Sequence, residues 1–470
     1  MPDLKFTTEQ KKALTVICMA AFLVPFMGAS INLALPEISE KLNIHGDSLH
    51  WIVTIYLLSS AIFQIPFAKI ADIAGRRRIF ITGLIIFSVF TMLCAFSTSG
   101  TMLIVFRFFS GIGSAMIFGT NIAILTASVP QSQRGKALGI NTMAVYSSMI
   151  ASPILGGFLT YYFGWKSIFI FCALIGVIVI IFSFIFLKKE WTGQQNDKFD
   201  LIGAILYGVS LFGIIYGFSE LTHIHGVVFL FAGIISLIIF IIYEKRAKFP
   251  ILNIQLFSKN KVFAFSSLAT LINYSATMGI GFMMSLYLQY IKGYDARHAG
   301  FIFIAQAFTQ TLCSLWSGKL SDRKNPATLA TTGMAIIVAG LAGLVFITET
   351  TPVFIIIIIL VLLGFGFGLF SSPNSNVIMS SVEKEYYSQA SATMGTMRLT
   401  GQSFSMGIVG MVTAIFVGNR PITPDLHENF MNSMNTIFLI FLVLCIVGVF
   451  ASTIRKKTTI TNTYLTHETN

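Results

Sequence analysis

Charged residues are scarce in this chain, and acidic residues are scarcer than basic ones. Only 11% of its 470 residues are Asp, Glu, Lys or Arg, whereas 55% are hydrophobic. A soluble globular domain is about a quarter charged, and the mean hydropathy here is +0.80. This composition excludes an ordinary soluble domain and indicates a protein that lies in a lipid bilayer.

Other features that the sequence lacks argue against catalysis. The five cysteines lie far apart in apolar runs and have no metal-ligand spacing, so neither a metal centre nor a disulfide framework is expected. The chain shows no P-loop and no nucleophile beside a general base. We therefore expect no metal, no cofactor and no catalytic residue, and we predict that the protein is not an enzyme.

Long apolar runs cover most of the chain, and each is long enough to cross about 30 Å of hydrocarbon. They predict an all-α polytopic membrane protein. The first run continues past Asn32, which is too long for a signal peptide. Fourteen spans are predicted, at 12–35, 49–70, 79–98, 102–128, 135–162, 165–187, 200–219, 225–243, 262–290, 298–319, 327–348, 352–380, 387–417 and 431–454.

The net charge of +12 follows the predicted topology. If both termini are inside, the 31 Lys and Arg residues divide into 24 in inside segments, 5 in outside loops and 2 within spans. This is a strong positive-inside bias. It predicts a multi-pass protein of a prokaryotic plasma membrane with both termini in the cytoplasm, in contact with anionic lipid and with no nucleic-acid partner.

One acidic–basic turn occurs twice along the chain. Asp72, Gly75 and Arg76 follow span 2, and Asp322 and Arg323 occupy the matching place after span 10. Gly75 permits a tight turn, and a carboxylate can pair with an arginine. We predict that both copies are cytoplasmic latches, which hold neighbouring helices together and can release them.

The two copies are in register only if spans 7 and 8 are an insertion. The sequence therefore predicts a 6 + 2 + 6 plan, with parallel halves as in several transporter folds. Spans 7 and 8 carry few polar residues and are expected at the outside of the bundle. The predicted units are a first six-helix bundle at 1–190, the inserted helices and linkers at 191–261, a second six-helix bundle at 262–454, and a tail at 455–470.

Two cations lie inside predicted spans. Arg107 falls in span 4 and Arg398 in span 13. A charge at mid-membrane costs at least about 2.5–3.5 kcal/mol on insertion scales, so each is expected to face the interior or a water-filled cavity. Gly111, one turn after Arg107, permits a close approach of helices.

Span 5 contains Pro153, Gly156 and Gly157. Proline interrupts the helical hydrogen-bond ladder, and the glycines let a neighbouring helix pack tightly. The pattern fits a bending point that takes part in coupling and fits a packing-only kink equally well.

In this order, the motifs resemble those of the major facilitator superfamily. The chain has Asp-x-x-Gly-Arg-Arg after span 2, Arg-x-x-x-Gly-x-Gly in span 4 and Pro-x-x-Gly-Gly in span 5. Fourteen spans, with Asn32–Pro36 closing the first, narrow the resemblance to the drug:proton antiporter branch of the QacA/EmrB type. It implies proton-driven export by alternating access, with Asp72 and Arg76 in a cytoplasmic gate and Arg107 in a proton-linked motif.

The sequence departs from this branch in span 1. Drug antiporters of the branch often have an Asp five residues before the Asn of span 1, where this chain has Met27. None of the 19 acidic residues lies clearly at mid-span. Since a cationic substrate in a low dielectric would normally need a carboxylate, we expect neutral, zwitterionic or anionic substrates.

Neutral polar side chains are expected to line a cavity between the halves, with Phe and Met as adaptable apolar wall. For each polar residue, a hydrogen bond between helices is at least as good an interpretation as ligand contact. The candidates are Asn32, Gln64, Asn121, Asn141, Asn273, Tyr274, Gln306, Gln310, Asn374 and Gln402.

The sequence thus favours a secondary transporter that exports hydrophobic or amphipathic small molecules and is coupled to protons. Its expected partners are that substrate, protons and membrane lipids. A lipid or lipid-precursor flippase, or a specific metabolite carrier of the same fold, is the first alternative. A non-transporting membrane sensor or scaffold is the second, because it would need no mid-membrane acid.

Overall fold

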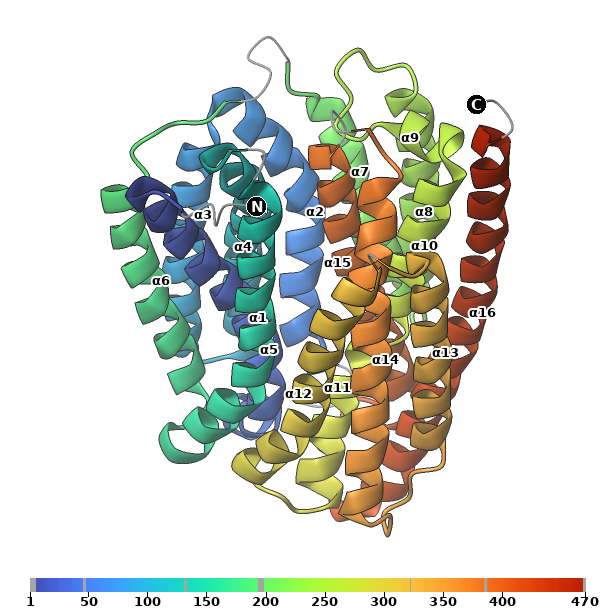
Figure 1. Ribbon diagram of the computed structural model, residues 1–470. Coiled ribbons are helices and arrows are strands. Elements are labelled where there is room, and N and C mark those ends of the chain that lie inside the picture. The colour runs from blue at the N-terminus through green and yellow to red at the C-terminus, as the bar shows by residue number, and fades with distance from the viewer. Residues whose placement is uncertain are drawn as a thin grey trace.

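The computed structural model describes residues 6–44, 48–130, 133–192, 198–321, 323–383 and 387–467, with side-chain detail up to residue 453 except at 387 and 388. Throughout these ranges the regular structure is helical (Figure 1). Thirteen helices of the described chain are long and apolar enough to cross a membrane. A fourteenth crossing is made of shorter pieces, α10, α11 and η3.

The first half and the inserted pair comprise eight long helices. They are α1 (Thr8–Leu42), α2 (Trp51–Ala74), α3 (Arg76–Ala95), α4 (Gly100–Ser128), α5 (Arg134–Phe163), α6 (Lys166–Phe186), α7 (Leu201–Ser219) and α8 (Ile224–Glu244). The remainder comprises α9 (Ile254–Lys259), α10 (Lys261–Ser275), α11 (Met278–Leu286), the π-helical turn η3 (Tyr287–Ile291), α12 (Ala296–Ser321), α13 (Pro326–Val345), α14 (Val353–Ser380), α15 (Tyr387–Phe416), the 3-10 turn η5 (Pro424–Leu426) and α16 (His427–His467).

Polar caps explain where several helices begin. Thr7 and Gln10 form a capping box at the start of α1, and the Ser99 side chain accepts a hydrogen bond at the start of α4. Asn260 and Asn325 do the same for α10 and α13. Such side chains satisfy amide groups that the first helical turn leaves unpaired.

The ninth predicted span, at 262–290, is not one continuous helix in the structure. Thr277 leaves the helical conformation, with φ −138° and ψ −23°. Its hydroxyl donates to the Asn273 carbonyl at 2.7 Å, and the amide of Gly279 donates to Ser405 Oγ of α15 at 2.9 Å. These bonds replace part of the lost ladder, which is the condition for a broken helix at membrane depth.

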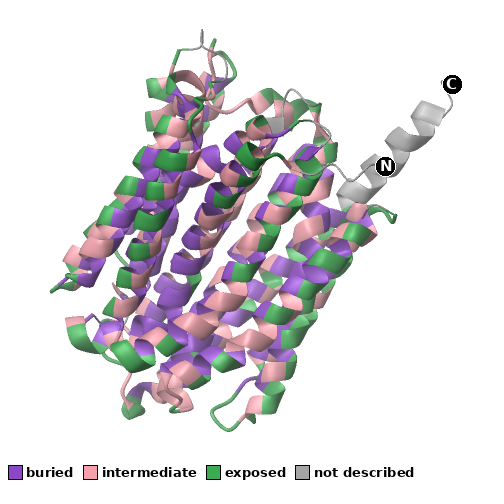
Figure 2. Ribbon diagram, turned by 60° about the vertical axis from the view of Figure 1, so that its left-hand side comes forward, coloured by how far each residue is buried: buried purple, intermediate pink, exposed green. Residues whose placement is uncertain are grey.

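The long helices run up and down between two faces (Figure 1). α1 begins and α16 ends on one face, which we call the terminal face; the other is the opposite face. Across the halves, α5 packs against α12, α2 against α15 and α1 against α11. Buried residues occupy the inner helix surfaces and exposed ones the outside (Figure 2), as expected for a bundle in lipid.

The inserted helices differ in position. α8 presents large apolar side chains such as Phe231, Ile238 and Ile242 at its exposed surface, which agrees with the expected place at the outside of the bundle. α7 instead contacts both halves. Tyr207 donates to the Ala61 carbonyl of α2 at 3.1 Å, and the ring of Phe218 packs against Phe404 of α15 at 4.7 Å.

Candidate functional site

The acidic–basic turn after α2 forms a network within the first half. Asp72 Oδ1 accepts hydrogen bonds from Nε and Nη2 of Arg76, each at 2.8 Å. Arg76 Nη1 lies 3.5 Å from the Ala123 carbonyl of α4, and the amide of Arg77 donates to Glu190 Oε1 at 2.8 Å. The turn therefore joins α2, α3 and α4 to the segment that follows α6.

Gly75 is required at this turn for two reasons. Its φ is +114°, a conformation that a side chain rarely tolerates. A Cβ on Gly75 would also lie only 2.7 Å from Cδ of Glu190. In the second copy, Asp322 lies outside the described residues, and Arg323 has an exposed side chain. The second latch therefore stays a prediction.

The side chain of Arg107 lies in the interior of the helix bundle. Its side chain is 1% exposed, Nε donates to the Ile52 carbonyl at 3.0 Å, and the guanidinium lies 4.2 Å from the centre of the Tyr56 ring. Nη1 and Nη2 have no hydrogen-bond partner among the described residues. Thus an aromatic face and one carbonyl take the place of a carboxylate.

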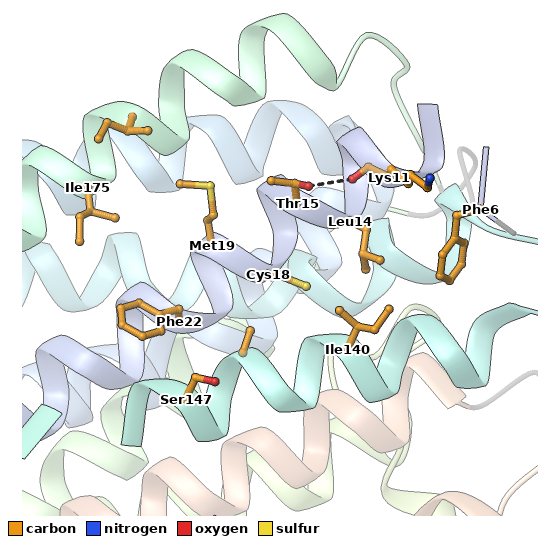
Figure 3. A pocket seen from close by; sticks show the side chains of 12 residues that line it. Phe6, Lys11, Leu14, Thr15, Cys18, Met19, Phe22, Ile140, Ser147 and Ile175 are labelled. Carbon is orange, nitrogen blue, oxygen red and sulfur yellow. Dashed lines mark hydrogen bonds between the residues drawn. The ribbon is translucent and has the colours of Figure 1, made fainter. Parts of the chain in front are cut away.

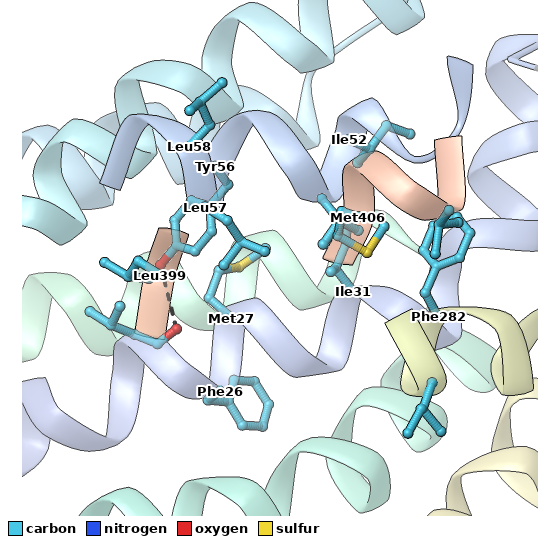
Figure 4. Packing of buried hydrophobic residues seen from close by; sticks show 14 of the residues in the cluster. Phe26, Met27, Ile31, Ile52, Tyr56, Leu57, Leu58, Phe282, Leu399 and Met406 are labelled. Carbon is cyan, nitrogen blue, oxygen red and sulfur yellow. Dashed lines mark hydrogen bonds between the residues drawn. The ribbon is translucent and has the colours of Figure 1, made fainter. Parts of the chain in front are cut away.

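The position that lacks the family's acid belongs to the apolar core. Met27 is fully buried and lies among Tyr56, Leu57 and other apolar side chains of α1 and α2 (Figure 4). A buried apolar side chain thus stands where drug antiporters of the branch often have an acid.

Gly111 brings α4 close to α2. A Cβ at Gly111 would stand 1.9 Å from Ser59 Oγ and 2.6 Å from the Tyr56 carbonyl. The contact places Arg107 of α4 against Tyr56 of α2. A small residue is therefore needed here for close helix approach, as the sequence predicts.

The adjacent glycines of α5 serve two different contacts. A Cβ on Gly156 would lie 2.8 Å from Cβ of Ser30 in α1, whereas one on Gly157 would lie 2.6 Å from the Ala296 carbonyl of α12. Pro153 also faces α12, since its carbonyl lies 2.3 Å from a Cβ built on Gly300. The motif therefore packs α5 against its own half and against the other half, and α5 remains one helix.

Further bonds join the halves near the opposite face. Ser285 Oγ donates to the Asn32 carbonyl at 2.7 Å, and Gln289 Nε2 lies 3.3 Å from the Leu33 carbonyl. These groups come from α1 and from the α11–η3 pieces of the broken span. Together with the α5–α12 contact, they hold the two halves against each other near the opposite face.

The start of α12 is fixed by Asp295. Its carboxylate accepts the backbone N–H of His298 at 2.8 Å and contacts the imidazole at 2.9 Å. Partial burial alone would raise the pKa of Asp295, but the bonds to His298 and the nearby Arg297 outweigh burial and hold this pKa below its usual range. Asp295 therefore stays ionised beside the α5–α12 contact.

A polar cluster lies between the halves, midway along the helices. The hydroxyl of Tyr146 in α5 hydrogen-bonds to Ser314 of α12, and it also interacts with Ser371 of α14. Tyr274 and Arg398 lie close enough to Tyr146 to interact electrostatically. We call these five residues the central cluster; the sequence predicted Tyr274 and Arg398 as site residues but missed the other three.

Arg398 is the cation of the central cluster. Its guanidinium lies 5.5 Å from the centre of the Phe118 ring of α4, across the halves, and the side chain is half-buried. Within the described side chains it forms no ion pair, in contrast to Arg76. A half-buried, unpaired cation between the halves attracts negative charge.

The side chains of two candidate cavity residues form hydrogen bonds to neighbouring helices. Asn121 donates to the Ile17 carbonyl of α1 at 3.0 Å. Asn374 donates to Thr270 Oγ1 at 2.9 Å and to the Ser266 carbonyl at 3.2 Å. Their geometry favours a role in packing.

Four other candidates have a buried polar atom without a partner among the described residues: Oδ1 of Asn32, Oε1 of Gln64, Oδ1 of Asn141 and Nδ2 of Asn273. Gln64 faces α15, since its Nε2 lies 2.6 Å from a Cβ built on Gly395. Such atoms are costly unless water or a ligand meets them.

The remaining candidates are half-buried. Gln310 of α12 reaches α5, where its Nε2 lies 3.9 Å from Sδ of Met149. Tyr274 belongs to the central cluster. Gln306 and Gln402 have partly exposed side chains, and no contact in the described part of the chain shows what they bind.

A separate groove lies on the first half, outside the interface between the halves (Figure 3). Its volume is about 840 Å³. α1 contributes Lys11, Cys18 and Phe22, α5 contributes Ile140, and α6 contributes Ile175. The groove was not predicted from the sequence, because it forms only where α1 packs beside α5 and α6.

Comparison with known proteins decides the family. The model of the Major Facilitator Superfamily matches residues 17–406. The chain belongs to this superfamily. Its fold matches a bacterial homologue of the human lysosomal transporter Spinster in an inward-facing, unoccupied conformation, with TM-score 0.71, 16% identity and coverage of 97% of this chain and 99% of the other.

Several transport proteins are similar to this chain over most of their length. The riboflavin transporter RibZ of Clostridioides difficile is 29% identical, over 84% of this chain and 86% of RibZ. The cephamycin export protein CmcT of Amycolatopsis lactamdurans is 28% identical, over 88% and 87%. The multidrug resistance protein Stp of Mycobacterium tuberculosis is 26% identical, over 87% and 77%. The chain is thus a transporter of this superfamily.

Proposed function

We propose that this transporter is a proton-coupled exporter of neutral or anionic amphipathic small molecules, of the fourteen-span drug:proton antiporter type. It acts in a prokaryotic plasma membrane, with the terminal face in the cytoplasm. The names of its relatives, which include a riboflavin transporter, a multidrug resistance protein and a cephamycin exporter, support a substrate of this class.

The charge of the interface carries the proposal. Arg398 lies in the central cluster without a described ion-pair partner. Arg107 is buried elsewhere in the first half, and two of its nitrogens have no described hydrogen-bond partner. No described acidic side chain balances either one. A permanent cation would meet repulsion there, whereas an anion or a strong dipole would be stabilised.

Buried polar atoms without described hydrogen-bond partners also support ligand binding between the halves. Asn273 lies beside the break between α10 and α11, and its Nδ2 is buried without a described partner. Gln64 presents a buried Oε1 from the facing half. A ligand with donors and acceptors can satisfy both groups, while the apolar remainder of the interface admits varied shapes.

The contacts between the halves fit alternating access. The α5–α12 contact at Gly157 and the α1–α11 bond at Asn32 close the opposite face. The network of Asp72, by contrast, is formed within the first half. We infer a conformer that is closed at the opposite face and receives substrate from the terminal face.

Transport assays in everted vesicles test the proposal. Vesicles with the full chain receive riboflavin, a cephamycin or the permanent cation ethidium, with and without an imposed proton gradient. We expect gradient-dependent accumulation of the neutral or anionic probe, and little of ethidium. If accumulation of the probe is unchanged when the proton gradient is collapsed, coupling to protons is contradicted. Preferential transport of ethidium would contradict the preference for neutral or anionic substrates. Absence of transport for every probe would favour the sensor or scaffold.

The groove of α1, α5 and α6 favours a second candidate, a lipid or lipid-precursor flippase. Its wall is apolar, with Lys11 as the cation that could meet a phosphate. A fluorescent phospholipid in proteoliposomes tests it: faster loss of outer-leaflet label than in protein-free liposomes would support flipping. Equal loss, together with transport of a water-soluble probe, would refute it.

A further inference from the structure

Two carboxyl groups meet at the terminal-face ends of the inserted helices. Asp200 caps the start of α7, where its Oδ1 accepts the amide of Gly203 at 2.9 Å and the hydroxyl of Tyr243 at 3.0 Å. Glu244 ends α8 and is 3% exposed, although it stands in a region that the sequence assigns to a linker. Its Oε1 accepts the amide of Ile251 at 3.3 Å.

Gly203 shows how close the carboxyl groups are. The position of a Cβ on this glycine lies 2.5 Å from Oε1 of Glu244 and 2.6 Å from Oδ2 of Asp200. These two oxygens are therefore at most 5.1 Å apart. Only a residue without a side chain leaves room for both carboxyl groups.

One oxygen of each carboxyl group lacks a hydrogen-bond partner in the part of the chain that the structure describes. Oδ2 of Asp200 and Oε2 of Glu244 are buried without a hydrogen-bond partner in the described chain. Two neighbouring ionised carboxylates with orphaned oxygens are costly in a low dielectric. One proton removes a charge and supplies a donor, so the pair is best satisfied when it holds a single proton.

The surrounding charges come from several elements. Lys69 of α2 lies within electrostatic reach of Glu244, and the amides of Ile251 and Leu252 also face it. Tyr243 of α8 donates to Asp200. Lys69 stands three residues before Asp72 in α2.

We propose that Asp200 and Glu244 form a proton-binding pair that holds one proton between them and faces Lys69. The proton exchanges with water at the terminal face. Its loss leaves a second negative charge, which strengthens the attraction between α8 and α2. Any role of this step in driving transport rests on the proposed proton-coupled function.

Infrared titration of the purified full-length protein tests the pair without a substrate. A carboxylic-acid carbonyl band is expected to persist at least about one pH unit above the ordinary glutamate value near 4.3. Glu244→Gln retains an oxygen that accepts the amide of Ile251 and is expected to abolish the band. Glu220→Gln, at the opposite-face end of α7 where Glu220 accepts from Trp51, is the matched control and leaves the band unchanged.

Two further variants predict opposite shifts of the titration midpoint. Asp200→Asn removes a like charge and lowers the midpoint, whereas Lys69→Gln removes an opposite charge and raises it. Lys69→Gln keeps both carboxyl groups, so it tests the pair even where Glu244→Gln fails to fold. A band unchanged in Glu244→Gln, or a midpoint unmoved in Lys69→Gln, would overturn the proposal.

The infrared titration and the transport assay test the proton-binding pair and the proposed function independently. A band that titrates as expected, in a protein whose transport ignores the proton gradient, supports the proton-binding pair and overturns only its coupling role. Proton-driven transport without such a band overturns the pair and leaves the proposed function standing.

Discussion

Gly157 offers the sharpest mechanical test of how the halves meet. In Gly157→Ala, the new methyl group would stand 2.6 Å from the Ala296 carbonyl and 3.3 Å from Cα of Arg297. Both are backbone positions of α12, so relief requires the two helices to move apart. Overpacking of this kind costs about 1–3 kcal/mol, and 1.4 kcal/mol is a factor of about ten in an equilibrium.

In the proposed alternating-access mechanism, that strain exists only while the opposite face is closed. Gly157→Ala is therefore expected to shift the population away from the closed conformer by about five- to a hundredfold. Ala296→Cys, a small change at a 7% exposed position, reports the shift through its labelling rate with a membrane-impermeant maleimide added from the opposite face. Protein with only the native cysteines gives the blank.

Two other glycines of α5 provide matched controls. A Cβ on Gly139 would have no neighbour within 4 Å, so Gly139→Ala leaves the labelling rate unchanged. Gly156→Ala strains a contact with Ser30 inside the first half, so it lowers thermal stability without faster labelling. Equal labelling rates in Gly157→Ala and Gly139→Ala would refute the role given to the α5–α12 contact.

Three other predictions follow from single contacts. Arg107→Met loses a cation–π contact of about 2 kcal/mol but removes a charge that costs at least about 2.5–3.5 kcal/mol to insert. The yield of folded protein in size exclusion is therefore expected to persist, while proton-driven transport falls. A misfolded variant would contradict this reasoning. Asn121→Ala is expected to lower thermal stability by about 1 kcal/mol and to leave substrate choice unchanged. Asn273→Ala is expected to change substrate choice and to leave thermal stability unchanged. If both variants behave alike in melting and transport assays, the distinction between a packing residue and a ligand-binding residue is refuted. Asp72→Asn weakens a partly exposed pair with Arg76 by at most about 1 kcal/mol, so yield holds while transport slows; an unchanged rate would remove Asp72 from the gate.

Composition and the length of the apolar runs predicted most of the fold. Apolar stretches must form helices in a bilayer because only helices or closed barrels satisfy every backbone group there. The break at Thr277 escaped prediction, since it depends on a hydroxyl bond to Asn273 and on Ser405 of α15. Hydropathy measures the length of a run and does not detect such local bonds.

The sequence draws attention to Arg107 and Arg398 because charge is unusual inside spans. Gly75 and Gly157 stand out through the motifs that contain them. Tyr146 did not stand out, since the importance of its hydroxyl comes from residues of other helices.

The buried carboxyl pair was also missed. Asp200 and Glu244 begin and end neighbouring spans, a spacing that signals proximity once the two spans are known to form a hairpin. Burial of Glu244 depends on the segment after α8, whose Ile251 amide binds it.

Reversal of the charge at Arg398 tests the central claim most directly. Arg398→Glu and the neutral control Arg398→Gln are compared in proteoliposomes with an anionic cephamycin and with ethidium. We predict that anion transport falls in both variants, and that ethidium transport appears in Arg398→Glu alone. An unchanged ratio of anion to cation transport in Arg398→Glu would contradict a substrate site organised around this cation.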